Sequence, residues 1–383
     1  MGLTRYAVLT AVAASALAAC GEAPSTPAQT SAPVATSSDV TAPEVTHLGT
    51  PRVMPLITGP NAVHHSQFAA GPNLQYNGGP VISNVKVVAV MWGSSVDSTV
   101  QSNVGPFFTA VTNSPYFDWL TEYNTSSQSI GRGTFDSVKV ITPSTSSQNL
   151  SDTTVANELN AQISAGHLPA PDSNTMYMTY FPPGVTISQG GQSSCQAFCA
   201  YHNSFTHGST PVFYGVVPDY GPGSGCDQGC GINPQMFDNI TSASTHEMIE
   251  AVTDADVGNN DLAWYDNQYG EIGDICADPN IVGSNTIDAD MAGYKVQLEW
   301  SNSRNSCIAQ DASAPTPTPT ATNTPPPPTP TPTTTGTPGG NGGHGHGASV
   351  GGCDVGDLGA VNGAFLSLLT LAALGATKLR RRD

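Results

Sequence analysis

Residues 85–92 read Val-Lys-Val-Val-Ala-Val-Met-Trp, and Gly93 follows them. A short run that is rich in β-branched residues and is stopped by glycine predicts a buried strand. Further along, the chain alternates between helical and strand patterns. We expect helices over 98–112, 117–123, 151–165 and 234–252, and further strands over 137–141, 175–181, 211–217 and 294–300. This alternation predicts a single α/β domain built on a mixed sheet.

The last expected helix carries the sequence His246-Glu247-Met248-Ile249-Glu250. Residues four apart lie on one face of a helix, so His246 and Glu250 are placed to hold one metal ion while Glu247 acts as a base beside it. Zinc peptidases use this spacing with a second histidine where this chain has Glu250, and a carboxylate is also a zinc ligand. The motif predicts a zincin-like domain with Glu247 as the catalytic residue.

A catalytic zinc site needs a third protein ligand. Glu271 lies 21 residues after Glu250, near the spacing used when a glutamate on the following element completes the site. We therefore expect Glu271 to be the third ligand and Asp274 to orient His246 through its other ring nitrogen. Asp256, ten residues after His246, is the alternative third ligand.

The stretch from Glu247 to Asp290 contains eleven acidic residues and no Lys or Arg. Carboxylates at this density repel one another, and a bound cation is one way to hold them close. Zinc is the expected cofactor. Two alternatives stay open: Asp254, Asp256 and Asp261 form a calcium loop that only stabilises the fold, or the stretch is a solvated acidic loop without a metal.

Basic residues are scarce in the whole chain. The formal net charge is −18, with 11 Lys and Arg against 29 Asp and Glu. Binding to phosphate groups needs clustered Lys or Arg, so we expect no nucleic acid partner.

Six cysteines lie within the expected domain, namely Cys195, Cys199, Cys226, Cys230, Cys276 and Cys307. An even number of cysteines in an exported chain predicts three disulfides, and the sequence does not select a pairing. A four-cysteine zinc site is the alternative, which the three-residue spacer within each of the first two pairs disfavours. His202 and His207, just after Cys199, are expected to be hydrogen-bonded structural residues.

The start of the chain predicts export. An apolar run over 6–19 ends in Leu-Ala-Ala-Cys, so residues 1–20 resemble a lipoprotein signal peptide with Cys20 as the lipidated residue. An ordinary secretory signal is the alternative. Residues 21–50 contain few large apolar side chains and are expected to be a disordered tether before the domain at 51–310.

The end of the chain predicts a membrane anchor. Residues 311–350 form a Pro/Thr/Gly-rich linker. Residues 351–383 then combine Cys353, an apolar stretch long enough to cross a bilayer over 358–377, and a basic end. This tail resembles the MYXO-CTERM type of sorting segment, and a plain membrane helix is the alternative. The sequence does not tell whether the tail is cleaved.

The domain contains Tyr-Asn-Gly-Gly-Pro-Val over 76–81 and then an ordered series of cysteines, from Cys-x-x-x-Cys-x-x-His at 195–202 to Cys307. In this pattern it resembles the EXORDIUM, or phosphate-induced, family of secreted proteins. The resemblance implies a secreted, wall- or surface-associated protein with a shared fold and shared disulfides. Plant members lack the His-Glu pair, whereas bacterial relatives carry His-Glu-x-x-Glu, so the catalytic hypothesis depends on the metal motif and not on the family.

Together these features predict an exported protein, anchored to the cell envelope by lipid and by the C-terminal helix. The expected function is that of a zinc-dependent, peptidase-like hydrolase that acts on a peptide, a protein or a cell-wall polymer. The alternative is a non-catalytic surface or wall-binding module with a structural calcium or zinc ion.

Overall fold

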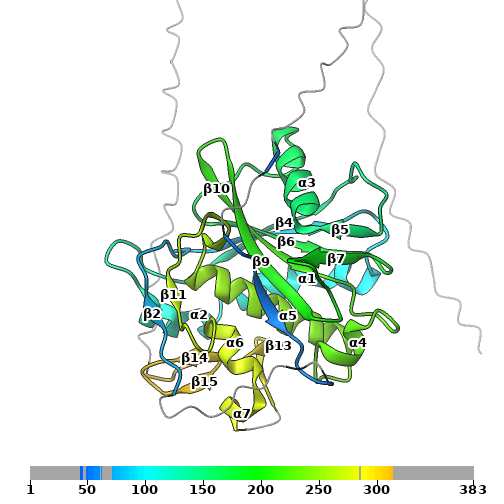
Figure 1. Cartoon of the computed structure of the whole chain (residues 1–383). Helices are drawn as coiled ribbons and strands as arrows, with labels where there is room; N and C mark the ends of the chain where they lie inside the picture. Colours follow the sequence, from blue (N-terminus) through cyan, green and yellow to red (C-terminus); the bar gives the residue numbers. More distant parts are fainter. Residues whose placement is uncertain (1–43, 46–48, 61, 63–70, 284–285, 314–383) are drawn as a thin grey trace, which may run out of the picture. The chain divides into compact units, whose positions relative to one another are not determined.

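The structure is a computed structural model that describes residues 44–45, 49–60, 62, 71–283 and 286–313 (Figure 1). The predicted signal peptide with Cys20, the C-terminal tail, and nearly all of the predicted tether and linker lie outside the described residues. Among the residues that are described, none of the helices has the length and apolar character needed to cross a membrane.

Six strands form the central sheet. Their order is β1 (Arg52–Pro55), β9 (Phe198–His207), β10 (Thr210–Val217), β6 (Thr175–Tyr180), β3 (Lys86–Met91) and β4 (Thr134–Val140). The last four run parallel to one another, whereas β9 runs antiparallel to both β10 and β1. The predicted mixed sheet and α/β class are therefore confirmed, with the strand expected at 85–92 as β3 in the interior of the sheet.

Helices cover both faces of this sheet. In β3, Val87 and Ala89 belong to the apolar cluster that includes α1 (Ser98–Val111) and α5 (Met236–Thr253). Val88 and Val90 point to the opposite face and pack in the cluster that includes α3 (Asp152–Ser164). In Figure 1, α3 lies above the sheet and α5 below it. A strand that is buried on both faces has no polar alternation, as the sequence of β3 shows.

The remaining elements are short. They are β2 (Gln75–Tyr76), α2 (Pro115–Asp118), the 3-10 helix η1 (Trp119–Tyr123), β5 (Asn149–Ser151), β7 (Thr186–Gln189), β8 (Gln192–Ser193), α4 (Cys226–Gly229), the 3-10 helix η2 (Val257–Asn259), β11 (Trp264–Tyr265), α6 (Ile272–Ala277), α7 (Pro279–Val282), β12 (Asp288–Met291), β13 (Tyr294–Gln297), β14 (Glu299–Ser301) and β15 (Ser306–Ile308). Of these, α6 and β13 pack against α5 and enclose its second face.

Helix α5 is buried along most of its length, since every residue from Ile240 to Thr253 is buried. It packs between the strands β9 and β10 on one side and β13 with α6 on the other. Polar side chains on this helix therefore face the protein interior whichever way they point. A helix that is buried all round and yet carries ionisable residues is a candidate for a functional site.

One strand was missed from the sequence, and one expectation about a strand was wrong. The ten-residue strand β9 was not predicted, because it is buried on both faces and its Asn, Ser and Thr residues hide the apolar pattern. The single strand expected over 294–300 is instead two strands, β13 and β14, each in its own two-stranded sheet. The chain leaves the first ladder where the Leu298 N–H donates to the Ile287 carbonyl and the Gln297 N–H donates to Thr245 on α5.

The described residues contain three disulfides, as predicted, and the structure supplies the pairing: Cys195–Cys226, Cys199–Cys230 and Cys276–Cys307. They indicate an oxidising, extracellular environment. Cys199 lies on β9 and Cys276 on α6. The bridges therefore tie down two of the elements that surround α5.

Candidate metal centre

Six ionisable side chains from three elements meet at the buried face between β9, α5 and α6. They are His202 of β9, His246, Glu247 and Glu250 of α5, Glu271 at the start of α6, and Asp274 within it. All except Asp274 are fully buried, with an exposed fraction of 0%, whereas the Asp274 side chain is 19% exposed. The cluster therefore reaches solvent at Asp274.

The first ligand group consists of His246, Glu250 and Asp274. The His246 Nε2 atom lies 3.2 Å from Glu250 Oε1 and 3.8 Å from Asp274 Oδ1. The other carboxylate oxygen of Asp274 accepts a hydrogen bond from the Glu271 backbone N–H at 3.3 Å. The helical spacing of four residues places His246 beside Glu250, as the motif predicts, and α6 brings the third ligand atom, an oxygen of Asp274.

Gln297 of β13 determines which nitrogen of His246 faces this group. The Gln297 Nε2 donates to the Gly273 carbonyl at 2.8 Å, so its Oε1 is the atom that lies 3.1 Å from His246 Nδ1. An amide oxygen only accepts, so His246 Nδ1 carries the proton and donates. Nε2 is then the ring nitrogen that faces Glu250 and Asp274, and it is the one left for a metal ion.

The second ligand group consists of His202, Glu247 and Glu250. The His202 Nδ1 atom lies 3.3 Å from Glu247 Oε2 and 3.5 Å from Glu250 Oε2. On the other side of the ring, His202 Nε2 lies 3.6 Å from Glu271 Oε1. The two oxygens of Glu250 therefore face different histidines, Oε1 toward His246 and Oε2 toward His202.

In the absence of a metal, burial and mutual charge shift the pKa of every one of these groups. Burial raises the pKa of Glu247 to about 7, and burial followed by repulsion from Glu250 raises the pKa of Glu271 well above its usual value. Burial lowers the pKa of His202, but the neighbouring carboxylates of Glu247 and Glu250 outweigh this and raise it to about 9. For Glu250 burial raises the pKa, but the two imidazoles outweigh it and lower the pKa to about 2.

Several polar atoms that face one another in the cluster have no hydrogen-bond partner although they are buried. They are His202 Nε2, His246 Nε2, Glu247 Oε1, Glu250 Oε2, both carboxylate oxygens of Glu271 and Asp274 Oδ1. Buried polar atoms normally have a partner, and an unpaired one is expensive. Because the donors are imidazole nitrogen and carboxylate oxygen, the residues fit a divalent cation, which this buried His/Glu cluster could hold.

The structure places the predicted site residues as follows. His246 and Glu250 lie together, and Glu247 lies beside them on the same helix. Glu271, the expected third ligand, contacts His202, whereas Asp274 lies at the metal-facing nitrogen of His246. The other ring nitrogen of His246, which we expected Asp274 to contact, lies 3.1 Å from Gln297 Oε1.

The predicted alternatives in the acidic loop lie outside both groups. The Asp256 Oδ1 atom accepts hydrogen bonds from Ser204 and from Asn259. The Asp254 Oδ1 atom accepts a hydrogen bond from the Ala263 backbone N–H. Within the described part of the chain, neither carboxylate joins a group of three possible ligands. These carboxylates hold the loop that follows α5.

From the sequence we expected His202 to be a hydrogen-bonded structural residue, and it does lie 3.3 Å from Glu247 Oε2. What the sequence did not predict is that its ring lies among three of the carboxylates. Its neighbour on the strand, His207, lies as expected in a hydrogen bond with Asn160 at 2.6 Å. The only feature of the sequence that pointed to His202 as a site residue was its position three residues after Cys199. Which of the two faces α5 depends on the strand β9 and its phase, which the sequence pattern did not reveal.

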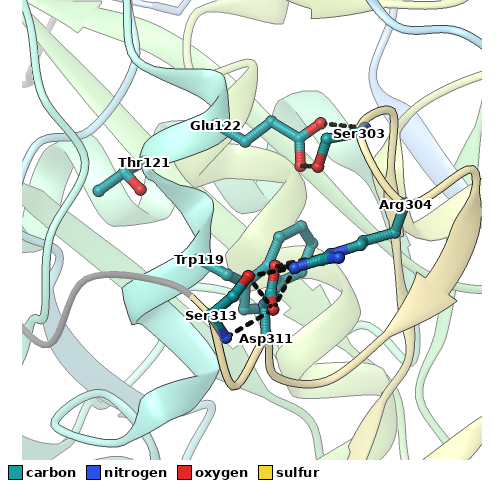
Figure 2. A pocket seen from close by; sticks show the side chains of 7 residues that line it. All are labelled: Trp119, Thr121, Glu122, Ser303, Arg304, Asp311 and Ser313. Atoms are coloured by element: carbon teal, nitrogen blue, oxygen red, sulfur yellow. Dashed lines mark hydrogen bonds and ion pairs between the residues drawn. The ribbon is translucent and has the colours of Figure 1, made fainter.

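A hollow of about 480 Å³ at another place on the surface shares no residue with the cluster (Figure 2). It is lined by Trp119, Thr121, Glu122, Ser303, Arg304, Asp311 and Ser313. The Arg304 guanidinium there is paired with Asp311 at 2.6 Å. None of the three-ligand groups in the described residues falls in this hollow, so the metal candidate is the buried cluster alone.

Comparison with protein-family models, with curated proteins and with solved structures finds no match to this chain.

Proposed function

We propose that this protein is a metal-dependent hydrolase of the cell exterior that uses zinc and acts on a peptide, a protein or a cell-wall polymer. The observation that carries the proposal is the ligand group of His246, Glu250 and Asp274 at the partly exposed side of the cluster. Beside it lies Glu247, a carboxylate on the same helix whose Oε1 atom has no hydrogen-bond partner. Three protein ligands with an adjacent base are the composition of a catalytic zinc site.

In this proposal His246 binds the metal through Nε2, because Gln297 occupies its other nitrogen. Asp274 takes the third position that the sequence suggested for Glu271, since Glu271 contacts His202. Glu250 contributes Oε1, which the Asp274 backbone N–H already orients with a hydrogen bond of 3.0 Å. Zinc, when it is bound, supplies Lewis-acid activation of a substrate carbonyl and of water.

Glu247 is the proposed general base. Its Oε1 atom is free to accept a proton from the attacking water, and it then returns the proton to the leaving group. Its other oxygen lies against His202, which holds the carboxylate in position. A general base of this kind contributes about 100- to 10,000-fold to the rate.

The ends of the chain and the family likeness complete the proposal. Lipid attachment at Cys20 and the apolar tail over 358–377 would hold the domain at the cell envelope. A likeness to the EXORDIUM family suggests a role at the cell wall, which is why wall polymers are among the proposed substrates.

The test is hydrolysis by the purified full chain, stripped of metal and reloaded with zinc, against a peptide library and wall fragments. We expect Glu247→Gln to lower cleavage at least about 100-fold without loss of fold. The matched control is Glu158→Gln, because Glu158 is also a buried glutamate, bonded to Gln162 and Ser144 on the other face of the sheet. Equal cleavage by wild type and Glu247→Gln would overturn the proposed role.

A second candidate function is favoured by the complete burial of five of the six side chains. A closed site of this kind suits a structural ion that stabilises a non-catalytic surface or wall-binding module. Zinc or calcium would then raise the melting temperature of the full chain while no substrate is cleaved. Binding to carbohydrate arrays that is unchanged in Glu247→Gln would support this candidate over the hydrolase.

A further inference from the structure

We propose that the cluster binds two divalent cations, with Glu250 as a bridging ligand between them. One cation takes the group of His246, Glu250 and Asp274, and the other takes His202, Glu247 and Glu250. The first of these sites is the proposed catalytic site, so the inference rests on the proposed function for that half. The second site, built on His202, is new.

The geometry of Glu250 supports a bridge. Its Oε1 atom lies 3.2 Å from His246 Nε2, and its Oε2 atom lies 3.5 Å from His202 Nδ1. Each carboxylate oxygen of Glu250 therefore lies beside a different imidazole ring. In two-metal hydrolases the ions lie about 3.5–4 Å apart, a separation that one carboxylate can span.

An unpaired atom points to a ligand in the second group independently of the acidic composition. Glu250 Oε2 is fully buried and has no hydrogen-bond partner. Glu250 Oε2 is aimed at His202, a ring that is also fully buried. In this arrangement Glu247 uses Oε2 as a ligand, and its Oε1 stays available as the base.

Charge balance favours two cations over one. Asp254, at the C-terminal end of α5, lies next to this cluster. It makes a fifth carboxylate beside Glu247, Glu250, Glu271 and Asp274. Arg52 stands opposite His202 in the pairing of β1 with β9 and brings one positive charge to this set. With metal bound, when the imidazoles are neutral ligands and the carboxylates are ionised, four negative charges are left, which two divalent cations neutralise and one does not.

The other basic side chains of the domain are engaged elsewhere. Lys86, Arg132, Lys295 and Arg304 are paired respectively with Asp172, Asp118, Asp290 and Asp311. Lys139 lies on β4, at the opposite edge of the sheet from β1 and Arg52.

The imidazole in each ligand group favours a transition cation such as Zn²⁺ over Ca²⁺.

The test is the number of zinc ions bound per chain. The purified full chain with intact disulfides is stripped, dialysed against Zn²⁺ and measured by elemental analysis. We expect two ions in the wild type and one in His202→Ala. Asp274→Ala is also expected to keep one ion, and Glu250→Ala to bind both at least about 10-fold more weakly. The matched control is His207→Ala on the same strand, which should keep two ions because His207 bonds to Asn160 outside the cluster.

One zinc per wild-type chain, or two in His202→Ala, would overturn the inference. If His202→Ala does not fold, the wild type reloaded with Mn²⁺ decides the question, since two ions at this distance give a spin-coupled resonance spectrum and one ion does not. The outcome is separable from the proposed function. Hydrolysis with a single ion refutes only the second site, and two ions without hydrolysis refute only the proposed activity.

Discussion

Gly273→Ala is expected to weaken metal binding, because α6 meets α5 at this residue without room for a side chain. A Cβ atom at Gly273 would lie 2.6 Å from His246 Nδ1 and 2.9 Å from Glu250 Oε1. Ordinary van der Waals contact starts at 3.4 Å. The methyl group would therefore push directly on two of the proposed ligands.

The size of the effect of Gly273→Ala depends on which side chains can move away from the added methyl group. Helix α6 is held by the Cys276–Cys307 bridge and by the bond from Gln297 to the Gly273 carbonyl, so His246 and Glu250 have to yield. Overpacking of this kind costs about 1–3 kcal/mol of stability. When His246 moves, it also loses Gln297, and loss of such an orienting bond lowers metal affinity about 10- to 100-fold. That change equals about 1.4–2.8 kcal/mol of binding free energy.

The assay is a zinc titration against a competing chelator, together with thermal melts of the stripped protein. The control is Gly105→Ala in α1, where the added Cβ would lie 3.2 Å from the Phe135 ring, away from the cluster. It should change stability and leave zinc affinity unaltered. If Gly273→Ala binds zinc as tightly as the wild type, then α6 does not position the ligands and the proposed centre is wrong.

Three further predictions concern the same centre. Gln297→Ala should lower zinc affinity about 10- to 100-fold, measured by the same titration, while Gln162→Ala, a buried glutamine on α3, should not. The metal-free protein should lose stability as the pH rises from about 5 to 9, measured by melting temperature, and zinc should reverse this trend. The sign follows because burial raises the pKa of Glu271 and Asp274, so the folded state keeps protons that the unfolded chain has released. His202, with its pKa raised from 6.5 to about 9, acts in the same direction, and the lowered pKa of Glu250 acts only below pH 4.5. Replacing Cys276 and Cys307 together by serine should cost about 4 kcal/mol of stability, because the bridge closes a 31-residue separation, and should weaken zinc binding by freeing α6. A double variant with wild-type zinc affinity would show that this bridge does not hold the ligands.

Local sequence patterns predicted much of the fold and the three site residues that lie on α5. The helices at 98–112 and 151–165 and the long helix at 234–252 are α1, α3 and α5, with ends within two residues of those expected. The pair of His246 and Glu250 also follows from local geometry, because a helix sets the relation between residues four apart. The prediction of one strand over 294–300 was wrong because the break in that strand depends on long-range contacts. These are the hydrogen bonds to Ile287 and to α5.

The sequence by itself determined the alternation of strands and helices, the presence of three disulfides and the position of two candidate ligands on one helix face. These features depend on period, composition and spacing along the chain. Only the tertiary structure decided that His202 enters the cluster, that Asp274 faces His246 while Glu271 faces His202, and that Gln297 fixes the tautomer. His246 and its partner Gln297, for example, lie 51 residues apart along the chain. Their approach is set by how β9, α6 and β13 pack around the helix, and no local pattern encodes that packing.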